Sequence, residues 1–328
     1  MSTPRRTAFE AALACLYCLL PLMAHCQTQG FPNRPVTLVV PFSPGGGTDT
    51  GTRNIAQRLT QKWGQPVIVD NRPGAAGMIG ADYVARATPD GYTLLIGNLG
   101  TQSINPILYK KLPYNPDTAF TAVSLIAELP LLLVVSQNSP AKSLGDLITL
   151  AKSKPGSLSF STSGAGGSMH LAAELLAANT GMKLLHVPYK GGGPAIQDLL
   201  AGQVDMSVAT ILELNAHIKA GKLRPLALMG VSRNAAFPDV PTVAEAAVPE
   251  FNATSWMGVL APAGTPKAVI ERISSDFQEV IKSAEIRDKL AGLGAVPVGS
   301  DPAQFQTLID RDRKQYARLI KERGISVD

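Results

Sequence analysis

The segment Val36 to Asp49, V-T-L-V-V-P-F-S-P-G-G-G-T-D, has the residue types of an anion-binding loop. Its apolar start suits a buried strand, and a helix pattern with Ile55, Leu59 and Trp63 on one face follows the glycines. A strand that turns through glycines into a helix leaves the backbone N–H groups of the first helical turn unpaired, at the positive end of the helix dipole. Such a turn can bind a carboxylate or a phosphate through its backbone.

Other interpretations of this segment differ in what the glycines are for. A Walker loop is excluded because no G-K-[ST] follows them. A loose dinucleotide fingerprint remains, since Gly45, Gly47 and Gly51 precede Asp70 at the end of the next expected strand. An ordinary strand–helix connection, which needs glycine only for its φ angles, is the third interpretation.

A second segment of the same character, Ser161 to Ser168 (S-T-S-G-A-G-G-S), follows an expected strand at Leu158–Ser161 and precedes an expected helix. We call Ser43–Asp49 the first loop and Ser161–Ser168 the second loop. Open α/β sheets bind ligands beyond the carboxyl ends of their strands, where both loops are expected. Two such loops facing each other would hold one small anion from both sides, whereas a dinucleotide enzyme needs only one.

The elements around the first loop predict a parallel sheet. Expected strands at Val36–Val40, Pro66–Asp70 and Tyr92–Gly97 alternate with helices, which gives a right-handed β-α-β-α-β unit. The stretch Asn98–Phe120 contains three prolines and is expected to be a surface excursion.

A second α/β unit follows a long apolar run at Ala122–Ser136, which Pro130 interrupts and which suits a strand that crosses between domains. Ser255–Leu260 is the expected return strand. The sequence therefore predicts two α/β lobes joined by two crossovers. We expect residues 27–126 with 251–328 as domain I, residues 127–250 as domain II, and hinges near Ala127–Leu133 and Phe251–Ser255.

The first 26 residues predict a secretory signal peptide. Arg5 and Arg6 precede an apolar stretch, and small residues at Ala24 and Cys26 suit cleavage before Gln27. A membrane anchor and a lipidated Cys26 are the alternatives. All three cysteines lie in this segment, so the exported chain would contain no disulfide, no thiolate nucleophile and no zinc–thiolate site.

Composition narrows the function further. The chain has 328 residues and a formal net charge of +5, without a clustered basic run, so nucleic-acid binding is not expected. His186 and His217 are isolated in sequence, which predicts no metal site. We expect no cofactor and a monomeric protein.

Six motifs appear in order along the chain: P-F-S-P-G-G-G-T-D, D-N-R-P-G-A-A-G-M-I-G-A-D, N-P-I-L-Y-K-K-L-P-Y, H-V-P-Y-K-G-G-G-P-A-I-Q-D-L-L-A-G-Q-V-D, F-P-D-V-P-T-V-A-E-A and S-W-M-G-V-L-A-P-A-G-T-P. As a set, and over nearly the whole exported chain, they resemble the Bug-type receptors of tripartite tricarboxylate transporters. The resemblance implies a periplasmic receptor with a type II Venus-flytrap fold. It also implies a small organic acid as ligand and integral membrane permease subunits as partners.

The resemblance also implies where the ligand carboxylate lies. Carried onto this chain, the main-chain amides that hold it belong to Ser43, Pro44, Gly45, Gly46, Gly47 and Thr48, and to Ser161, Thr162, Ser163 and Gly164. Gln102 stands where the family commonly has histidine, and Ala75-Ala76 with Met78 replaces a glycine-richer turn. Both places are expected at the cleft mouth, where the far end of the ligand is read.

Four further residues are candidates for the ligand site. Asn98 and Thr101 follow the third strand and suit the distal group of the ligand. Lys190 either pairs with a second carboxylate or is a solvated loop lysine. Asp205 is expected to end a strand near the cleft, where it binds the ligand or the neighbouring backbone.

The remaining polar residues have two interpretations each. Asp49 either contacts ligand or caps its helix, and His170 either contacts ligand or is a buried structural histidine. A hydrolase built on Ser168 and His170 is an alternative function, but there is no G-x-S-x-G motif and no acidic third member is evident. A receptor that feeds a sensor instead of a permease would have the same site.

Overall fold

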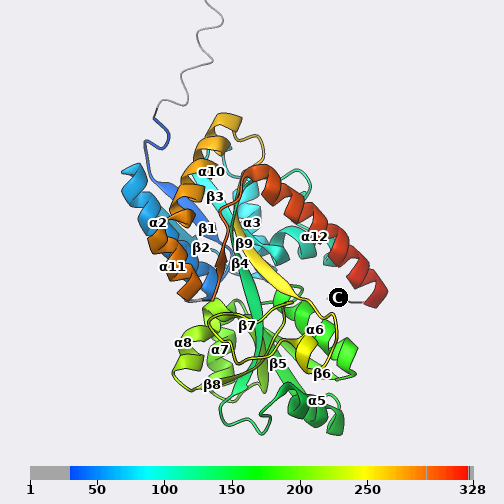
Figure 1. The fold of residues 1–328 in the computed structure, drawn as a ribbon. Coiled ribbons are helices and arrows are strands. Elements are labelled where there is room, and N and C mark those ends of the chain that lie inside the picture. Colours follow the sequence, from blue (N-terminus) through cyan, green and yellow to red (C-terminus); the bar gives the residue numbers. More distant parts are fainter. Residues whose placement is uncertain (1–29, 293, 324, 326–328) are drawn as a thin grey trace, which may run out of the picture. The chain divides into compact units, whose positions relative to one another are not determined.

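The computed structural model describes residues 30–292, 294–323 and 325. The expected signal segment, residues 1–26, lies outside them. Residues from Arg34 onward form one compact unit, and the description below concerns this unit alone (Figure 1).

The first sheet is built on three parallel strands. β1 (Val36–Val40) lies between β2 (Val67–Asn71) and β3 (Thr93–Asn98), and β9 (Thr254–Pro262) runs antiparallel beside β3. Most of β1 is buried, which explains its continuous apolar sequence. The predicted β-α-β-α-β unit is confirmed.

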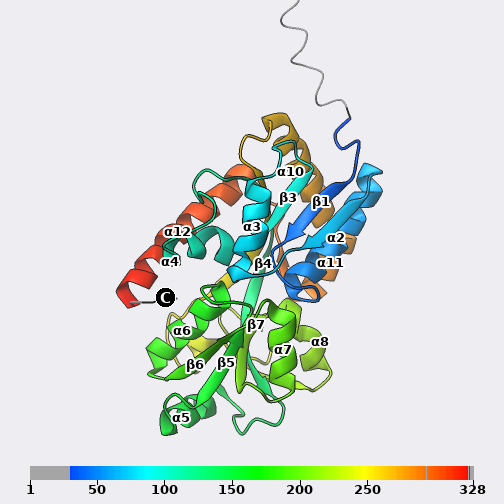
Figure 2. The same ribbon diagram turned by 180° about the vertical axis from the view of Figure 1, so that it is seen from behind.

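Helices cover both faces of this sheet, and together they form the first lobe. Figures 1 and 2 show α2, α10 and α11 along one side and α3 and α12 along the other. Trp63 joins two of these helices, because its Nε1 donates to Asp276 Oδ2 at 2.8 Å. The helices are α2 (Gly47–Trp63), α3 (Met78–Ala85), α10 (Lys267–Lys282), α11 (Ala284–Gly292) and α12 (Pro302–Arg323).

The second lobe repeats the pattern with a second parallel sheet. β5 (Leu158–Thr162) lies between β6 (Leu184–Pro188) and β7 (Met206–Thr210), and β8 (Leu223–Leu228) completes it. Phe160 and Leu176 are fully buried in the core of this lobe. Its helices are α5 (Leu144–Ser153), α6 (Ser168–Thr180), α7 (Gly192–Leu200), α8 (Ile211–Lys219) and α9 (Val243–Ala246).

One long strand, β4 (Phe120–Ser136), belongs to both sheets. Its first part, up to Pro130, pairs with β9, and from Leu131 onward it pairs with β7 and β8. The main path is therefore β2-β1-β3-β9-β4-β7-β5-β6, with the short β10 (Val296–Pro297) also paired to β4. The prediction of a strand crossing between the lobes is confirmed, and Pro130 lies where the partner strand changes.

The predicted surface excursion after β3 is wrong in its first part. η3 (Gly100–Ile104) and α4 (Asn105–Leu108) follow β3, and residues 101–105 are buried. Helix α12 covers them: Ser103 Oγ donates to Ile309 O, and Arg313 Nε donates to Gln102 O. Polar residues can be buried here because the neighbouring backbone supplies their hydrogen-bond partners.

Helix caps follow the sequence signals in most places. Ser143 with Asp146, and Thr242 with Glu245, form capping boxes at the starts of α5 and α9. Asp301 Oδ1 accepts from Gln304 N at the start of α12. Thr265 does not cap α10, because its hydroxyl donates to Pro262 O instead.

Candidate functional site

The first loop joins β1 to α2 and is held by one buried carboxylate. Asp49 Oδ2 accepts from Gly45 N at 3.0 Å and from Arg53 Nε at 2.9 Å, and Oδ1 accepts from Asn71 Nδ2 at 3.0 Å. Burial alone would raise the pKa of Asp49, but these hydrogen bonds and the Arg53 charge lower it below its usual value. An ionised Asp49 therefore fixes the shape of the loop.

The second loop joins β5 to α6 and is held by a hydroxyl and two imidazole rings. Thr162 Oγ1 donates to Gly164 O at 3.0 Å and lies 2.7 Å from His186 Nε2. Gly166 N donates to His170 Nδ1 at 3.0 Å, which fixes the turn before the helix.

The two histidines behind the second loop lie in a stack of rings. The ring centroids of His170 and His186 are 3.9 Å apart, and Phe160 stacks on His186 at 4.7 Å. Burial, and then the charge of His170, lower the pKa of His186 to about 3. His186 is therefore a neutral partner of Thr162, and His170 has the structural role that one interpretation of the sequence gave it.

Both loops line one small cavity, which we call the inner cavity. The volume open to the centre of a water molecule in this cavity is about 20 Å³, which is enough for one water molecule. Its lining combines backbone-rich positions with polar side chains from both lobes: Phe42, Gly46, Thr48, Asp49, Asn98, Ser163, Met169, Gly192 and Glu213.

A larger outer cavity of about 210 Å³ shares Phe42 and Ser163 with the inner one. Gly164 and Lys190 line it from the second lobe, and the Ala75–Gly77 turn lines it from the first. The turn at Ala75-Ala76 therefore lines a cavity that the second loop also lines. Gln102 does not line either cavity, because it is buried and its Nε2 donates to Thr101 Oγ1 at 3.4 Å.

Each loop touches a different part of the opposite lobe. In the first loop, Ser43 Oγ donates to Lys190 O at 2.7 Å. In the second loop, Ala165 O accepts from Tyr109 OH at 3.1 Å. The loops therefore share a cavity, but neither closes directly on the other.

All of the predicted site residues except Thr101 and Asp205 fall into three groups. Those that line the two cavities are Gly46, Thr48, Asn98, Ser163, Gly164 and Lys190. Those of the first loop that instead contact the second lobe or shape the loop are Ser43, Pro44, Gly45 and Gly47. The hydroxyls of Ser161 and Thr162 point into their own lobe, where Ser161 donates to Ala195 O.

Two predicted ligand residues lie elsewhere. Thr101 is buried and its Oγ1 is bonded to the backbone of Asn98, so it shapes the strand end and does not line the cavities. Asp205 precedes β7, and its Oδ2 accepts from Ser159 N at 2.7 Å. The register pairs Phe160 with Met206, so Asp205 lies at the amino end of the strands, away from the second loop.

Glu213 is the cavity residue that the sequence reasoning missed. It stands three residues after Thr210, the N-cap of α8, and its Oε2 accepts from Thr210 N and Oγ1, both at 3.0 Å. The backbone N–H of Gly47 also donates to this carboxylate. Burial raises the pKa of Glu213, against these hydrogen bonds, which lower it. The T-x-x-E spacing was a visible signal of the cap, but not of the contact with the first loop.

The Ser168 and His170 pair lacks the geometry of a hydrolase. Ser168 Oγ donates to Ser255 Oγ at 3.0 Å, while His170 Nδ1 accepts from the backbone of Gly166. The hydroxyl is thus not bonded to the imidazole that would have to activate it.

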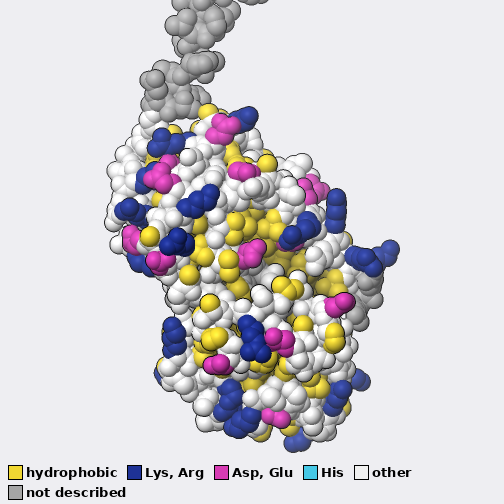
Figure 3. Space-filling model, in the orientation of Figure 1, with side chains coloured by type: hydrophobic (Ala, Val, Ile, Leu, Met, Phe, Trp, Pro, Cys, Tyr) yellow, Lys and Arg dark blue, Asp and Glu magenta, His cyan; other side chains and the backbone are white. Residues whose placement is uncertain are grey.

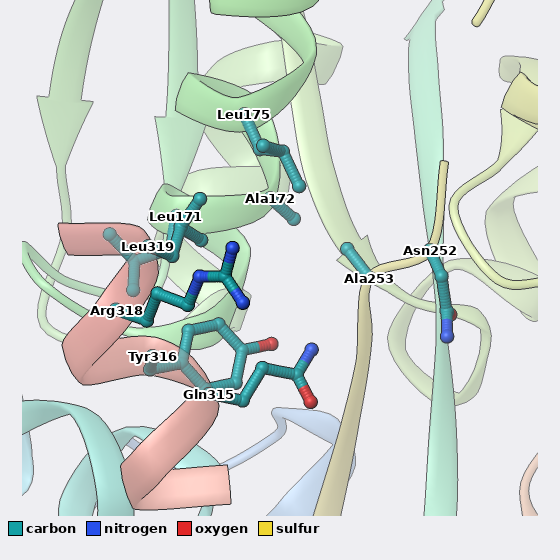
Figure 4. Close-up of a pocket in the computed structure, with 9 residues that line it drawn as sticks. All are labelled: Leu171, Ala172, Leu175, Asn252, Ala253, Gln315, Tyr316, Arg318 and Leu319. Carbon is teal, nitrogen blue, oxygen red and sulfur yellow. The ribbon is translucent and has the colours of Figure 1, made fainter. Parts of the chain in front are cut away.

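A separate cavity of about 160 Å³ lies between α6 and α12 (Figure 4). Figure 4 shows Leu171 and Leu175 of α6 facing Tyr316 and Leu319 of α12. Neither loop contributes to this lining.

On the face in Figure 3, acidic and basic side chains are scattered in small groups without a large patch of either sign. No helix within the described residues has the length and apolarity to span a membrane.

Two α/β lobes on a shared strand, with a cavity between loops at their strand ends, define a two-lobe binding protein of the periplasmic type. The sequence profile described as "Tripartite tricarboxylate transporter family receptor" matches residues 52–325, and the chain belongs to this family. The Bug-type resemblance is thereby confirmed.

Individual relatives match over most of their length. Protein BugT of Bordetella pertussis is 36% identical over 304 residues, which are 92% of this chain and 93% of BugT. The structure of R. palustris Rpa4515 with adipate is 38% identical with a TM-score of 0.88, over 90% of this chain and 99% of that one. MatC from Rhodopseudomonas palustris with bound malate is 34% identical with a TM-score of 0.84, over 88% and 100% of the two chains.

Proposed function

We propose that this chain is a periplasmic receptor that binds a small organic carboxylate in the inner and outer cavities. It would deliver this ligand to the membrane permease of a tripartite tricarboxylate-type transporter. Family membership supports the receptor class, and the adipate and malate bound to two relatives support a carboxylate as the ligand.

The observation that carries this proposal is the convergence of helix starts on the inner cavity. Gly46 is the N-cap of α2, Gly192 begins α7, and Ser163 lies in the loop that leads into α6. The N–H groups of a first helical turn have no partner inside the helix and attract anions. No lysine or arginine is among the described residues that line this cavity, so backbone donors are its source of positive potential.

Opening and closing of the lobes would admit and retain the ligand. The contacts Ser43–Lys190 and Tyr109–Ala165 hold the lobes together near the cavities. The hinges would be the crossover segments near Ala127–Leu133 and Phe251–Ser255, between domain I (27–126 with 251–328) and domain II (127–250). Residues 1–26 would direct export and would be removed in the process.

A thermal-shift screen of the exported protein against mono-, di- and tricarboxylates tests the proposal. A ligand at 100 times its dissociation constant adds roughly 2.7 kcal/mol to the free energy of unfolding, which gives a clear shift. Gly46→Leu or Gly164→Leu should abolish the shift, whereas Gly145→Leu, on the exposed side of α5, should preserve it. No shift with any acid, or full affinity in both loop variants, would contradict the proposal.

A further inference from the structure

Glu213 places a carboxylate inside the proposed ligand site itself. Its side chain lines the inner cavity together with Asn98 and Ser163. Oε2 is held by Thr210 at the start of α8, so the position of the carboxylate is fixed by its own helix. The side chain is half-buried, and it contacts Gly47 of the first loop.

The backbone around this carboxylate is shaped to admit it. A Cβ on Gly192 would overlap Glu213 Oε1, and a Cβ on Gly47 would lie 2.9 Å from Glu213 Cγ. Glycine at these two helix starts therefore allows α2 and α7 to approach the carboxylate closely. Glu213 already takes the Gly47 amide, so a ligand carboxylate must use other donors of the two loops.

The carboxyl group of Glu213 has no cationic partner among the described residues that line the inner cavity. Asp49, the other acidic residue there, is different, because Arg53 pairs with it at 2.9 Å. A ligand bound in this cavity therefore meets one fixed acceptor without a counter-charge. A second carboxylate beside Glu213 would be repelled, and a cationic hydrogen-bond donor would be attracted.

We propose that Glu213 makes this receptor select acids that carry an ammonium group beside the bound carboxylate over plain dicarboxylates of the same length. This inference rests on the proposed function, since it assumes that the loops hold a ligand carboxylate. The ammonium would donate to Glu213, and the remainder of the ligand would extend past Phe42 into the outer cavity. The selected class thus differs from the adipate and malate bound to the relatives.

Isothermal titration with matched pairs of acids tests this selection. The pairs are aspartate with succinate, glutamate with glutarate, leucine with 4-methylpentanoate and phenylalanine with 3-phenylpropanoate. In each pair the two acids share a carbon skeleton and differ in the ammonium group. The full exported protein should bind the amino member of its preferred pair at least about tenfold more tightly, as expected for a hydrogen bond to a charged group.

Glu213→Gln should remove most of this preference while the protein stays folded, because glutamine also serves in a capping box. Glu271→Gln, which removes an exposed negative charge on α10, is the matched control and should leave the preference unchanged. Tighter binding of the unsubstituted acid to the unmodified protein, or an unchanged preference in Glu213→Gln, would overturn the inference while the receptor proposal stands. If no acid of either kind binds, both proposals fall.

Discussion

The first and second loops have nearly the same composition, yet the structure holds them in different ways. The first depends on a single ionised group, Asp49, which bonds to Gly45, Arg53 and Asn71. The second has no carboxylate in this role and depends chiefly on Thr162 and two stacked histidines. Glycine and hydroxyl content therefore predicts the turn that each loop makes, but not the groups that stabilise it.

The glycines beside the two helix starts, Gly47 and Gly167, also differ in the space around them. A Cβ on Gly47 would lie 2.9 Å from both Glu213 Cγ and Thr210 Oγ1. A Cβ on Gly167, before α6, would have Gly164 O at 3.9 Å as its nearest neighbour. The first loop has no spare room against the second lobe, whereas the glycine before α6 has ordinary clearance.

The largest effect on ligand affinity should come from substitution of Gly47, which has less space around it than Gly167. We expect Gly47→Ala to weaken carboxylate binding about 100-fold, because the new methyl group blocks the approach of α2 to Glu213 in the closed form. Gly167→Ala, at the N-cap of α6 in the second loop, should preserve affinity. Isothermal titration measures both. Equal losses in the two variants would show that the loops approach their neighbours alike.

The next largest effect concerns stability, and it should follow substitution of Asp49 in the first loop or Thr162 in the second. Asp49→Ala should lower the free energy of unfolding by about 2 kcal/mol, because it removes hydrogen bonds to a buried charge, and Thr162→Val by about 1 kcal/mol. The stability due to Asp49 should be present at neutral pH and lost as the pH falls below the ordinary aspartate value, since the folded protein lowers this pKa. Urea unfolding of the unmodified protein and both variants at pH 7 gives the two losses in the free energy of unfolding. The same measurement at pH 3 shows how much of the loss due to Asp49→Ala remains. A larger loss from Thr162→Val would reverse the comparison.

His186 should make the second loop sensitive to mild acid. The pKa of His186 is about 3 in the folded protein against 6.5 in the unfolded chain, so below pH 6.5 the unfolded chain binds a proton that the folded protein does not. Stability should therefore fall as the pH drops from 6.5 toward 3, by less than about 1.4 kcal/mol per pH unit because the ring is partly solvated.

His186→Gln keeps a donor for Thr162 Oγ1 but does not titrate, so the advantage of the unmodified protein over this variant should shrink as the pH falls. Thermal unfolding of both proteins between pH 7 and pH 4 measures it. A difference that stays constant with pH would show that His186 is not held neutral.

The smallest effect is expected at Asp205. Its carboxylate binds Ser159 at the amino end of β5, so Asp205→Ala should lower the melting temperature slightly and leave ligand affinity unchanged. Isothermal titration with the ligand found for the unmodified protein checks this. A clear loss of affinity would return Asp205 to the ligand site.

Much of the fold followed from local sequence signals. The strand before the first loop and the crossing strand β4 both depend on apolar patterns within a few residues, and both were predicted. The burial of Thr101 and Gln102 was not, because it depends on α12, a helix that contacts them from the far end of the chain. Long-range packing of this kind has no local signature.

The same difference between local signals and long-range contacts explains why only part of the site was predicted. Gly46 and Ser163 lie at strand ends, where topology alone brings them to the cavity. Glu213 was missed because its cavity contact with Gly47 joins two lobes, although its cap is local. Asp205 was misplaced because it was expected to end a strand, whereas it precedes β7 and lies at the amino end of the strands.

A crystal structure of the receptor with an acid that shifts its melting temperature would test the central claim most directly. We predict that the ligand carboxylate lies within hydrogen-bonding distance of backbone amides in both the first and the second loop. A ligand seated in the cavity between α6 and α12, or one held by side chains without contact to either loop, would contradict it.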